Sequence, residues 1–243
     1  MPNPRTPIRE FFERHYKPER TKKSQRLINQ LNSKRVKNDQ KRTSELYGKL
    51  ARFHGGLQTP DLLEHQLNQI LSNVKFLPSD DVLSIGSGTG LTETFIAKNV
   101  LHSGKMTCVD VAHGMSKVAS VIKGKENASN MHVITASGTN IPVRAGTQDV
   151  VLCIQSNLPD MKSWGKILDE SRRVLRPIGR AKLVVTLLPE EKNKGKVISK
   201  ACEDLEKHDF AIEKLLHYLD IDGPKGKRYY GVIVVARPIT IFG

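Results

Sequence analysis

A short apolar run that ends in three alternating glycines constrains the fold of this chain more than any other feature. Residues 82 to 90 read VLSIGSGTG, and an amphipathic helical pattern follows from Leu91. This order predicts a buried strand, a tight turn and a helix, because glycine adopts backbone angles that other residues avoid. The N-terminus of such a helix presents unpaired N–H groups to a polar ligand. The segment therefore predicts a strand–turn–helix unit that binds a ligand.

The position of one aspartate and the glycine spacing indicate the class of ligand. A second apolar run ends at Asp110, about twenty residues beyond the glycines, where a carboxylate accepts hydrogen bonds from both ribose hydroxyls in nucleotide-binding folds. The third glycine is Gly90, whereas the dinucleotide pattern G-x-G-x-x-G requires it at Leu91, and G-x-x-x-x-G-K-S/T is absent. We therefore expect a nucleoside-containing cofactor. A tight turn without a ligand is the alternative interpretation of this motif taken alone.

The glycine turn and four later segments resemble, in order, motifs of the class I S-adenosylmethionine-dependent methyltransferases. The later segments are VAHGM at 111–115, VITASGTNIPV at 133–143, QDVVLCI at 148–154 and SRRVLRPIGR at 171–180. The resemblance covers about residues 78 to 190, and it is greatest to the ubiquinone- and menaquinone-biosynthesis subgroup (methyltransferase type 11). It implies an enzyme with a Rossmann-like α/β fold, in which a doubly wound, mostly parallel seven-stranded sheet has an antiparallel last strand.

The resemblance also implies S-adenosyl-L-methionine as the cofactor and a set of site residues. Asp110 would bind the ribose hydroxyls, while Val111 and Met115 would pack against the adenine. No general base and no metal ligand are assigned. The implied cofactor-binding residues are Ser84, Gly86, Ser87, Gly88, Gly90, Asp110, Val111, Met115, Ser137, Gly138, Ile154 and Gln155, and the acceptor-side residues are Ser156, Asn157 and Tyr47.

Two acidic residues that are usual in the family are replaced by serine. Ser84 stands where a carboxylate helps to hold the methionine amino group, and Ser137 stands where an aspartate reaches the adenine amino group. Serine exchanges hydrogen bonds but carries no charge. These changes predict weaker cofactor binding than is usual in the family. They also leave an alternative function, that of a cofactor-binding regulatory protein without transfer activity.

The segment after the fourth predicted strand bears on the acceptor. Residues 157–160 read NLPD, without the D/N-P-P-Y/F pattern that enzymes use to hold the exocyclic nitrogen of a base. This difference favours a small-molecule or lipid-like acceptor, methylated by in-line displacement at the sulfonium carbon.

The positive charge of the chain is concentrated near its N-terminus. The net charge is +14, and residues 1–52 alone carry fifteen Lys and Arg against five Asp and Glu, a balance of +10. Basic residues with the interspersed aromatics Phe11, Phe12 and Tyr16 are typical of an RNA-binding surface. RNA or ribonucleoprotein methylation through residues 1–52 is therefore an alternative function. The other interpretation is an arm whose few apolar residues dock on the main domain.

We predict a basic helical extension over residues 1–57 and the methyltransferase domain over residues 58–243. Leu46, Tyr47, Leu50 and Phe53 recur at helical spacing from Ser44 onward. A second helix is expected to begin with Thr59 as its cap and Pro60 in its first turn.

Composition predicts a cytoplasmic protein without a membrane span. No apolar run reaches eighteen residues, and the basic N-terminus lacks the apolar core of a secretory signal. The three cysteines Cys108, Cys153 and Cys202 are widely spaced and form no C-x-x-C pair. This spacing predicts reduced thiols rather than a disulfide framework.

Overall fold

The computed structural model describes residues 8–15, 26–27, 30, 40–51, 60–154, 162–177, 180–222 and 228–239. Within them one seven-stranded sheet has the order β3-β2-β1-β4-β5-β7-β6. The neighbouring strands among β1 to β5 are parallel, and β7 is antiparallel to both β5 and β6. The strands are β1 (Asp81–Ile85), β2 (Lys105–Asp110), β3 (Met131–Thr135), β4 (Val150–Cys153), β5 (Lys182–Leu187), β6 (Phe210–Asp222) and β7 (Arg228–Pro238). The expected doubly wound sheet is confirmed.

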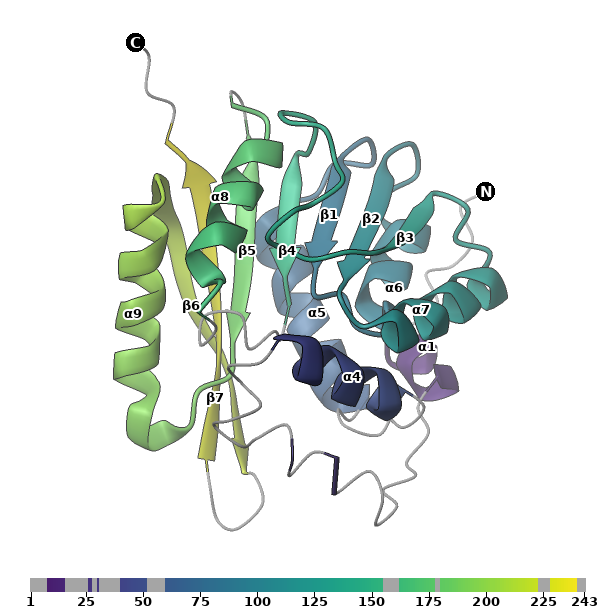
Figure 1. The fold of residues 1–243 in the computed structure, drawn as a ribbon, viewed down its shortest axis with the longest axis horizontal. Coiled ribbons are helices and arrows are strands. Elements are labelled where there is room, and N and C mark those ends of the chain that lie inside the picture. Colours follow the sequence, from purple (N-terminus) through teal and green to yellow (C-terminus); the bar gives the residue numbers. More distant parts are fainter. Residues whose placement is uncertain are drawn as a thin grey trace.

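Helices cover both faces of this sheet (Figure 1). They are α1 (Ile8–His15), α4 (Gln40–Leu50), α5 (Pro60–Val74), α6 (Leu91–Asn99), α7 (His113–Glu126), α8 (Trp164–Val174) and α9 (Lys194–Lys207), with a 3-10 turn over Glu191–Asn193. Apolar residues of α1, α5, α6 and α7 share one core cluster, and those of α8 and α9 share a second one. No described helix is both long and apolar enough to cross a membrane.

Strands β1, β4 and β5 form the centre of the core because nearly all of their side chains, on both faces, are buried. Val82 contributes to the cluster on one face, while its neighbour Leu83 contributes to the cluster on the other. Apolar runs of this kind are usual in parallel sheets, whose two faces are covered by crossover helices. The order of the strands reverses between β1 and β4. In open α/β sheets, ligands commonly bind at the carboxyl edge beside such a reversal.

Helix α1 of the N-terminal extension packs into the core of the domain. Phe11 and Phe12 are each only 1% exposed. The Phe11 ring meets Phe95 of α6 edge to face, with ring centres 5.3 Å apart. The expectation that Phe11 and Phe12 offer stacking surfaces to RNA is therefore wrong, because hydrophobic burial holds both rings inside. Tyr16 lies outside the described residues, and the boundary at residue 57 stays a prediction.

A buried carboxylate adds a polar anchor to α1. The Glu126 side chain is 7% exposed and lies 2.9 Å from both His15 Nε2 and Lys98 Nζ, with Arg14 at 3.8 Å. Burial on its own would raise the pKa of Glu126, but the hydrogen bonds from Lys98 and His15 lower it below its ordinary value. The cluster ties α1, α6 and α7 together.

Several elements are longer than their sequence patterns predicted. Helix α4 begins at Gln40 rather than Ser44, and Phe53 and Thr59 lie outside the described residues. Strand β6 extends over Phe210–Asp222, because β7 pairs with it along its whole length. Strand pairing is a tertiary contribution that local alternation does not reveal.

Candidate active site

The three glycines of the turn between β1 and α6 all adopt left-handed backbone angles. Their φ values are 70° at Gly86, 56° at Gly88 and 67° at Gly90, a region that residues with a side chain rarely enter. The N–H groups of Gly86 and Ser87 donate to the Val109 carbonyl at 2.8 and 3.2 Å. These bonds fix the turn against the end of β2.

Gly90 has a packing role in addition to its turn conformation. It occupies the N-cap position of α6, and a Cβ atom there would lie 2.9 Å from Met131 Cε and 3.0 Å from Ala119 Cβ. The absence of a side chain thus lets α6 approach α7 and β3 closely. The predicted place of Gly90 among the cofactor-binding residues stays a prediction.

The Asp110 carboxylate lies at the end of β2 and is turned toward the glycine turn. Its Oδ2 accepts a hydrogen bond from the Gly88 N–H and its Oδ1 accepts one from the Ala112 N–H, each at 2.8 Å. Burial raises the pKa of Asp110, and these two N–H groups act in the opposite direction. A carboxylate has about four acceptor sites, so the two backbone bonds leave capacity for further hydroxyl donors. The arrangement fits the ribose-binding role expected of this residue.

A second buried carboxylate, which the sequence patterns did not single out, lies below the same turn. Ser84 is fully buried on β1, and its hydroxyl donates a 2.7 Å hydrogen bond to Glu93 Oε1. Glu93 belongs to the first turn of α6 and is 3% exposed. Burial raises the pKa of Glu93 to about 7, Ser84 and the backbone N–H of Glu93 lower it, and Asp110 raises it. The one available sequence signal was an acidic residue in the first turn of the helix after the glycines.

Helix α4 lies against α7 and the segment that follows β2 (Figure 1). The Ser44 hydroxyl donates to the Val111 carbonyl at 2.9 Å, directly after β2. A Cβ atom on Gly114 would lie 2.5 Å from the carbonyl oxygen of Gly48, so these two glycines let α4 and α7 meet closely.

The expected adenine-packing residues differ in accessibility. Val111 is 40% exposed, whereas Met115 is 1% exposed and packs with Ala51 and Ala112. Tyr47 packs against this cluster. Its predicted contact with the acceptor stays a prediction.

The loop after β3 approaches the end of β1. A Cβ atom on Gly138 would lie 2.8 Å from Ile85 Cγ2, directly before the glycine turn. The hydroxyl groups of Ser137 and Thr139 are hydrogen-bonded at 2.9 Å. The loop thus places Gly138 next to the last residue before the glycine turn. The predicted contact of Ser137 and Gly138 with the adenine stays a prediction.

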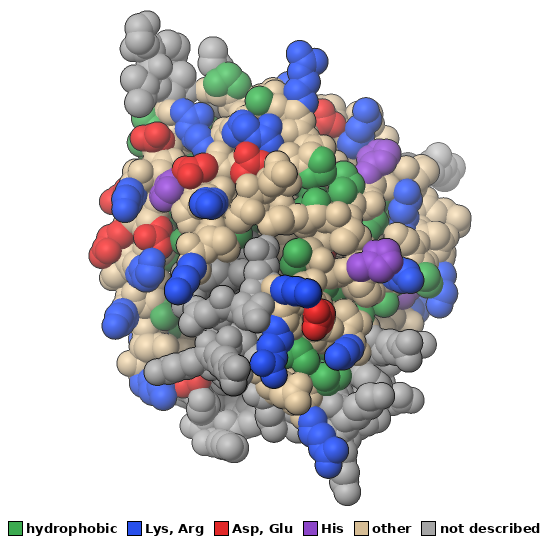
Figure 2. All heavy atoms as spheres, in the orientation of Figure 1, with side chains coloured by type: hydrophobic (Ala, Val, Ile, Leu, Met, Phe, Trp, Pro, Cys, Tyr) green, Lys and Arg blue, Asp and Glu red, His purple; other side chains and the backbone are tan. Residues whose placement is uncertain are grey.

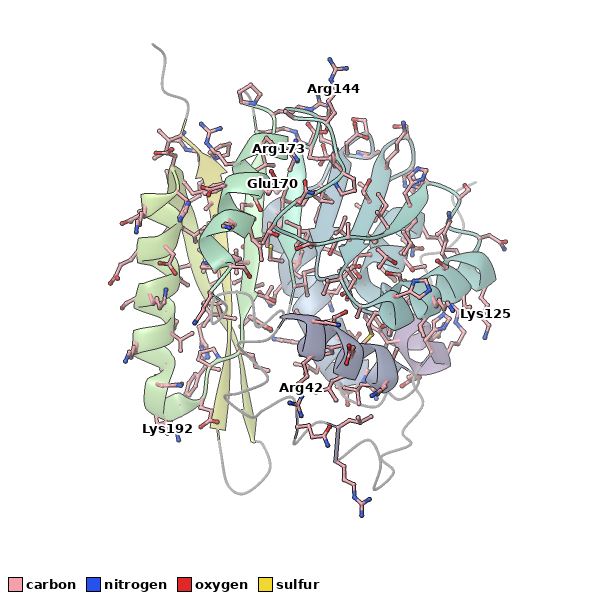
Figure 3. All side chains as sticks on the ribbon, in the orientation of Figure 1. Arg42, Lys125, Arg144, Glu170, Arg173 and Lys192 are labelled. Carbon is pink, nitrogen blue, oxygen red and sulfur yellow. The ribbon has the colours of Figure 1, made fainter. Side chains whose placement is uncertain are left out.

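Two residues of α8 hold the next part of this loop (Figure 3). Glu170 Oε2 accepts a hydrogen bond from the Ile141 N–H at 2.7 Å, and Arg173 donates to the Ile141 and Val143 carbonyls at 2.9 Å. The Glu170–Arg173 pair therefore supports the loop from the end of the sheet opposite α4.

The predicted acceptor side is only partly described. Ile154 follows β4 and packs at the edge of the core. Gln155, Ser156 and Asn157 lie outside the described residues. Cys153, at the end of β4, is buried, and burial raises the pKa of its thiol to about 12, so it is a neutral thiol at pH 7.

Comparisons with known proteins agree with this geometry. A family model described as a methyltransferase domain matches residues 82–179. A search of curated proteins gave no match. Among solved structures, the chain is similar to an S-adenosylmethionine-dependent methyltransferase from Aquifex aeolicus, with 20% identity and a TM-score of 0.63 over 77% of this chain and 97% of that one.

Two further solved structures share the fold. The cyclase SpnF has 15% identity and a TM-score of 0.62 over 75% of this chain and 84% of that one. A geranyl diphosphate methyltransferase in complex with S-adenosylmethionine has 12% identity and a TM-score of 0.60 over 79% of this chain and 90% of that one. Identities of this size show a common fold, and they confirm the expected fold class.

Proposed function

We propose that this chain methylates a small-molecule or lipid-like acceptor, from the premise that its residues 82–179 are the methyltransferase domain of a class I S-adenosylmethionine-dependent enzyme. The expected enzyme class and cofactor are thereby confirmed, and the type 11 subgroup is consistent with them. When bound, S-adenosyl-L-methionine supplies an electrophilic methyl group, so the residues of the chain need only bind and orient the reactants.

The orientation of Asp110 is the observation that carries the proposal. Its carboxylate is fixed by the Gly88 and Ala112 N–H groups and lies at the carboxyl edge of the sheet, next to the point where the strand order reverses. The adjacent Val111 offers an exposed apolar surface to a base. A carboxylate for the sugar hydroxyls and an apolar surface for the base together suit an adenosyl group.

Helix α4 supports transfer by closing one side of this site. Ser44 and Gly48 hold it against the segment that follows β2. A wall at this position limits the access of water to a bound sulfonium and favours displacement by a positioned acceptor.

The acceptor class is inferred from residues 157–160 and from the resemblance. The sequence NLPD lacks both the paired prolines and the aromatic ring that suit an exocyclic base nitrogen. One similar structure acts, according to its description, on geranyl diphosphate, which is a small lipid-like molecule. We therefore favour a small or lipid-like acceptor over a nucleic-acid base.

A basic surface on α4 favours RNA methylation as the second candidate function. Lys41, Arg42 and Lys49 are exposed on α4, beside the predicted cofactor site. Figure 2 shows Lys and Arg side chains on this part of the molecule, and Figure 3 shows Arg42 pointing away from the sheet. Cations in this position could contact the phosphates of a polyanionic acceptor.

The first experiment is calorimetric titration of the full chain with S-adenosyl-L-methionine. We expect saturable binding that Asp110→Ala abolishes and that Asp169→Ala, a substitution at an exposed residue of α8, leaves unchanged. Binding that is equally strong in the Asp110→Ala variant would contradict the proposed site.

The second experiment distinguishes the acceptors. Transfer of labelled methyl to small and lipid-like molecules is compared with transfer to RNA, in the wild type and in a Lys41→Glu/Arg42→Glu variant. Transfer to RNA alone, lost in that variant and steeply reduced by salt, would favour the second candidate. Cofactor binding without transfer to any acceptor would favour the regulatory function. Truncation of the extension is a poor test, because it removes Phe11 and Phe12 from the core.

We also propose that the protein acts in the cytoplasm. Cys108, Cys153 and Cys202 are free thiols, and two of them are buried. Free thiols are usual in reducing compartments.

A further inference from the structure

The carboxylate of Glu93 is held at a defined place under the glycine turn. Ser84 lies two residues before Gly86, and its hydroxyl donates a 2.7 Å hydrogen bond to Glu93 Oε1. Both side chains are buried, and Glu93 approaches from α6 while Ser84 approaches from β1. The charge that β1 lacks at Ser84 is thus present beside it, supplied by the helix.

Within the described part of the chain, no Lys, Arg or His forms an ion pair with Glu93. The titratable groups that interact with it are Asp110 and the Cys108 thiol, both on β2. Lys123 of α7 acts on Cys108, and burial raises the pKa of that thiol so that it stays neutral. A buried carboxylate with a carboxylate neighbour and no cation is unfavourable on its own. A cationic ligand would remove this cost.

The cofactor of the proposed function carries positive charge in its methionine portion, on the sulfonium and on the ammonium group. The Asp110 carboxylate contacts the turn by accepting a hydrogen bond from the Gly88 N–H. Glu93 contacts Ser84, which lies two residues before the start of the same turn. We propose that Glu93 is a cofactor-binding residue that supplies the negative charge for the methionine portion, with Ser84 as its positioning residue. This inference rests on the proposed function and assigns a role to a residue that the family motif does not include.

A consequence for pH follows from the burial of Glu93. Its pKa is raised to about 7 in the free protein, and a bound cation lowers it because the cation stabilises the carboxylate. Binding at pH 6 therefore releases close to one proton. Affinity rises by up to about tenfold per pH unit below pH 7 and levels off above it.

The experiment is titration of the full chain with S-adenosyl-L-methionine between pH 5.5 and 8.5, in two buffers that differ in ionisation enthalpy. We expect the wild type to release a proton at pH 6. The Glu93→Gln variant should release none and bind at least tenfold more weakly at pH 8. The control is Glu203→Gln, at an exposed residue of α9, which should match the wild type.

A swap of positions tests the location of the charge. The double variant Ser84→Asp/Glu93→Gln returns a carboxylate to β1 and should recover affinity at pH 8. Thermal unfolding without ligand verifies that each variant is folded, and the proton count of the wild type needs no variant.

The possible outcomes separate this inference from the proposed function. Binding without proton release, together with undiminished affinity of Glu93→Gln, would overturn the role of Glu93 and leave the proposed function intact. A folded wild type that does not bind S-adenosyl-L-methionine at any pH would overturn the proposed function and, with it, this inference.

Discussion

The Gly88 N–H donates a 2.8 Å hydrogen bond to the carboxylate of Asp110, which joins the glycine turn to the end of the neighbouring strand. The donor comes from the turn that follows β1, and the acceptor is the last residue of β2. One contact therefore fixes both the shape of the turn and the direction of the carboxylate.

A side chain at Gly88 should block cofactor binding. Its φ of 56° disfavours a β-branched residue by about 1–2 kcal/mol, and the added atoms enter the space through which the cofactor approaches the turn. We expect Gly88→Val to lower the affinity for S-adenosyl-L-methionine by more than about tenfold, or more than about 1.4 kcal/mol, in calorimetric titration. The control is Gly124→Ala, because a Cβ atom at this position of α7 would meet no atom within 4 Å. Unchanged affinity of the valine variant would show that the cofactor does not approach Gly88.

The third glycine should matter for stability. In Gly90→Ala the new Cβ would meet Met131 and Ala119 at 2.9 and 3.0 Å, at a φ of 67°. We expect a loss of about 1–3 kcal/mol in the free energy of unfolding, measured with denaturant. Gly124→Ala meets nothing within 4 Å and should be neutral or stabilising by up to about 1 kcal/mol. Equal stability of the two variants would contradict the packing role.

Helix α1 should contribute to the stability of the domain. Phe11 is 1% exposed and packs on Phe95, so Phe11→Ala leaves a cavity and should cost about 3–5 kcal/mol in the free energy of unfolding. Leu77, which is 46% exposed, provides the comparison, and Leu77→Ala should change stability by less than about 0.5 kcal/mol. A small effect of Phe11→Ala would mean that α1 is not docked in solution.

The pH dependence of unfolding should reveal Glu93 without any ligand. Its pKa is raised from 4.5 to about 7 on folding, so its protonated form is favoured in the folded state. The corresponding stability is fully present below pH 4.5 and is lost as the pH rises through about 7, by up to about 3 kcal/mol. Unfolding experiments at pH 5 and pH 8 should show this loss in the wild type and a smaller one in Glu93→Gln. If the free energy of unfolding changed with pH by the same amount in the wild type and in Glu93→Gln, the burial of this carboxylate would be contradicted.

The ionisation of Glu126 should change stability with pH in the opposite direction, so that stability is lost as the pH falls. Burial opposes its ionisation, but Lys98 and His15 lower its pKa below 4.5. Its contribution is therefore present above pH 4.5 and is lost as the pH falls through the lower value in the folded protein. Glu126→Gln should destabilise the protein at pH 7 and reduce its sensitivity to acid, as measured by denaturant unfolding at pH 3 and pH 7. A variant as stable as the wild type at pH 7 would contradict this role.

Local sequence patterns predicted the fold because each segment carries its own signal. The alternation of apolar runs and helical patterns reflects a sheet whose central strands β1, β4 and β5 are buried on both faces. Asp110 could be placed because its distance from the glycines is set by the length of one helix and one strand. The ends of β6 and α4 could not be placed as well, because pairing and packing with distant segments determine them.

The sequence by itself determined the strand–turn–helix unit, the position of Asp110 and the order of the motifs, since these depend on residues close together in the chain. Only the tertiary structure decided that Glu93 supplies a carboxylate to Ser84, that Gly90 lets two helices meet, and that Phe11 and Phe12 are inside the core. Each of these depends on the packing of one element against another. Such contacts leave no periodic signal in the sequence, so burial and charge at these positions were fixed only when the chain folded.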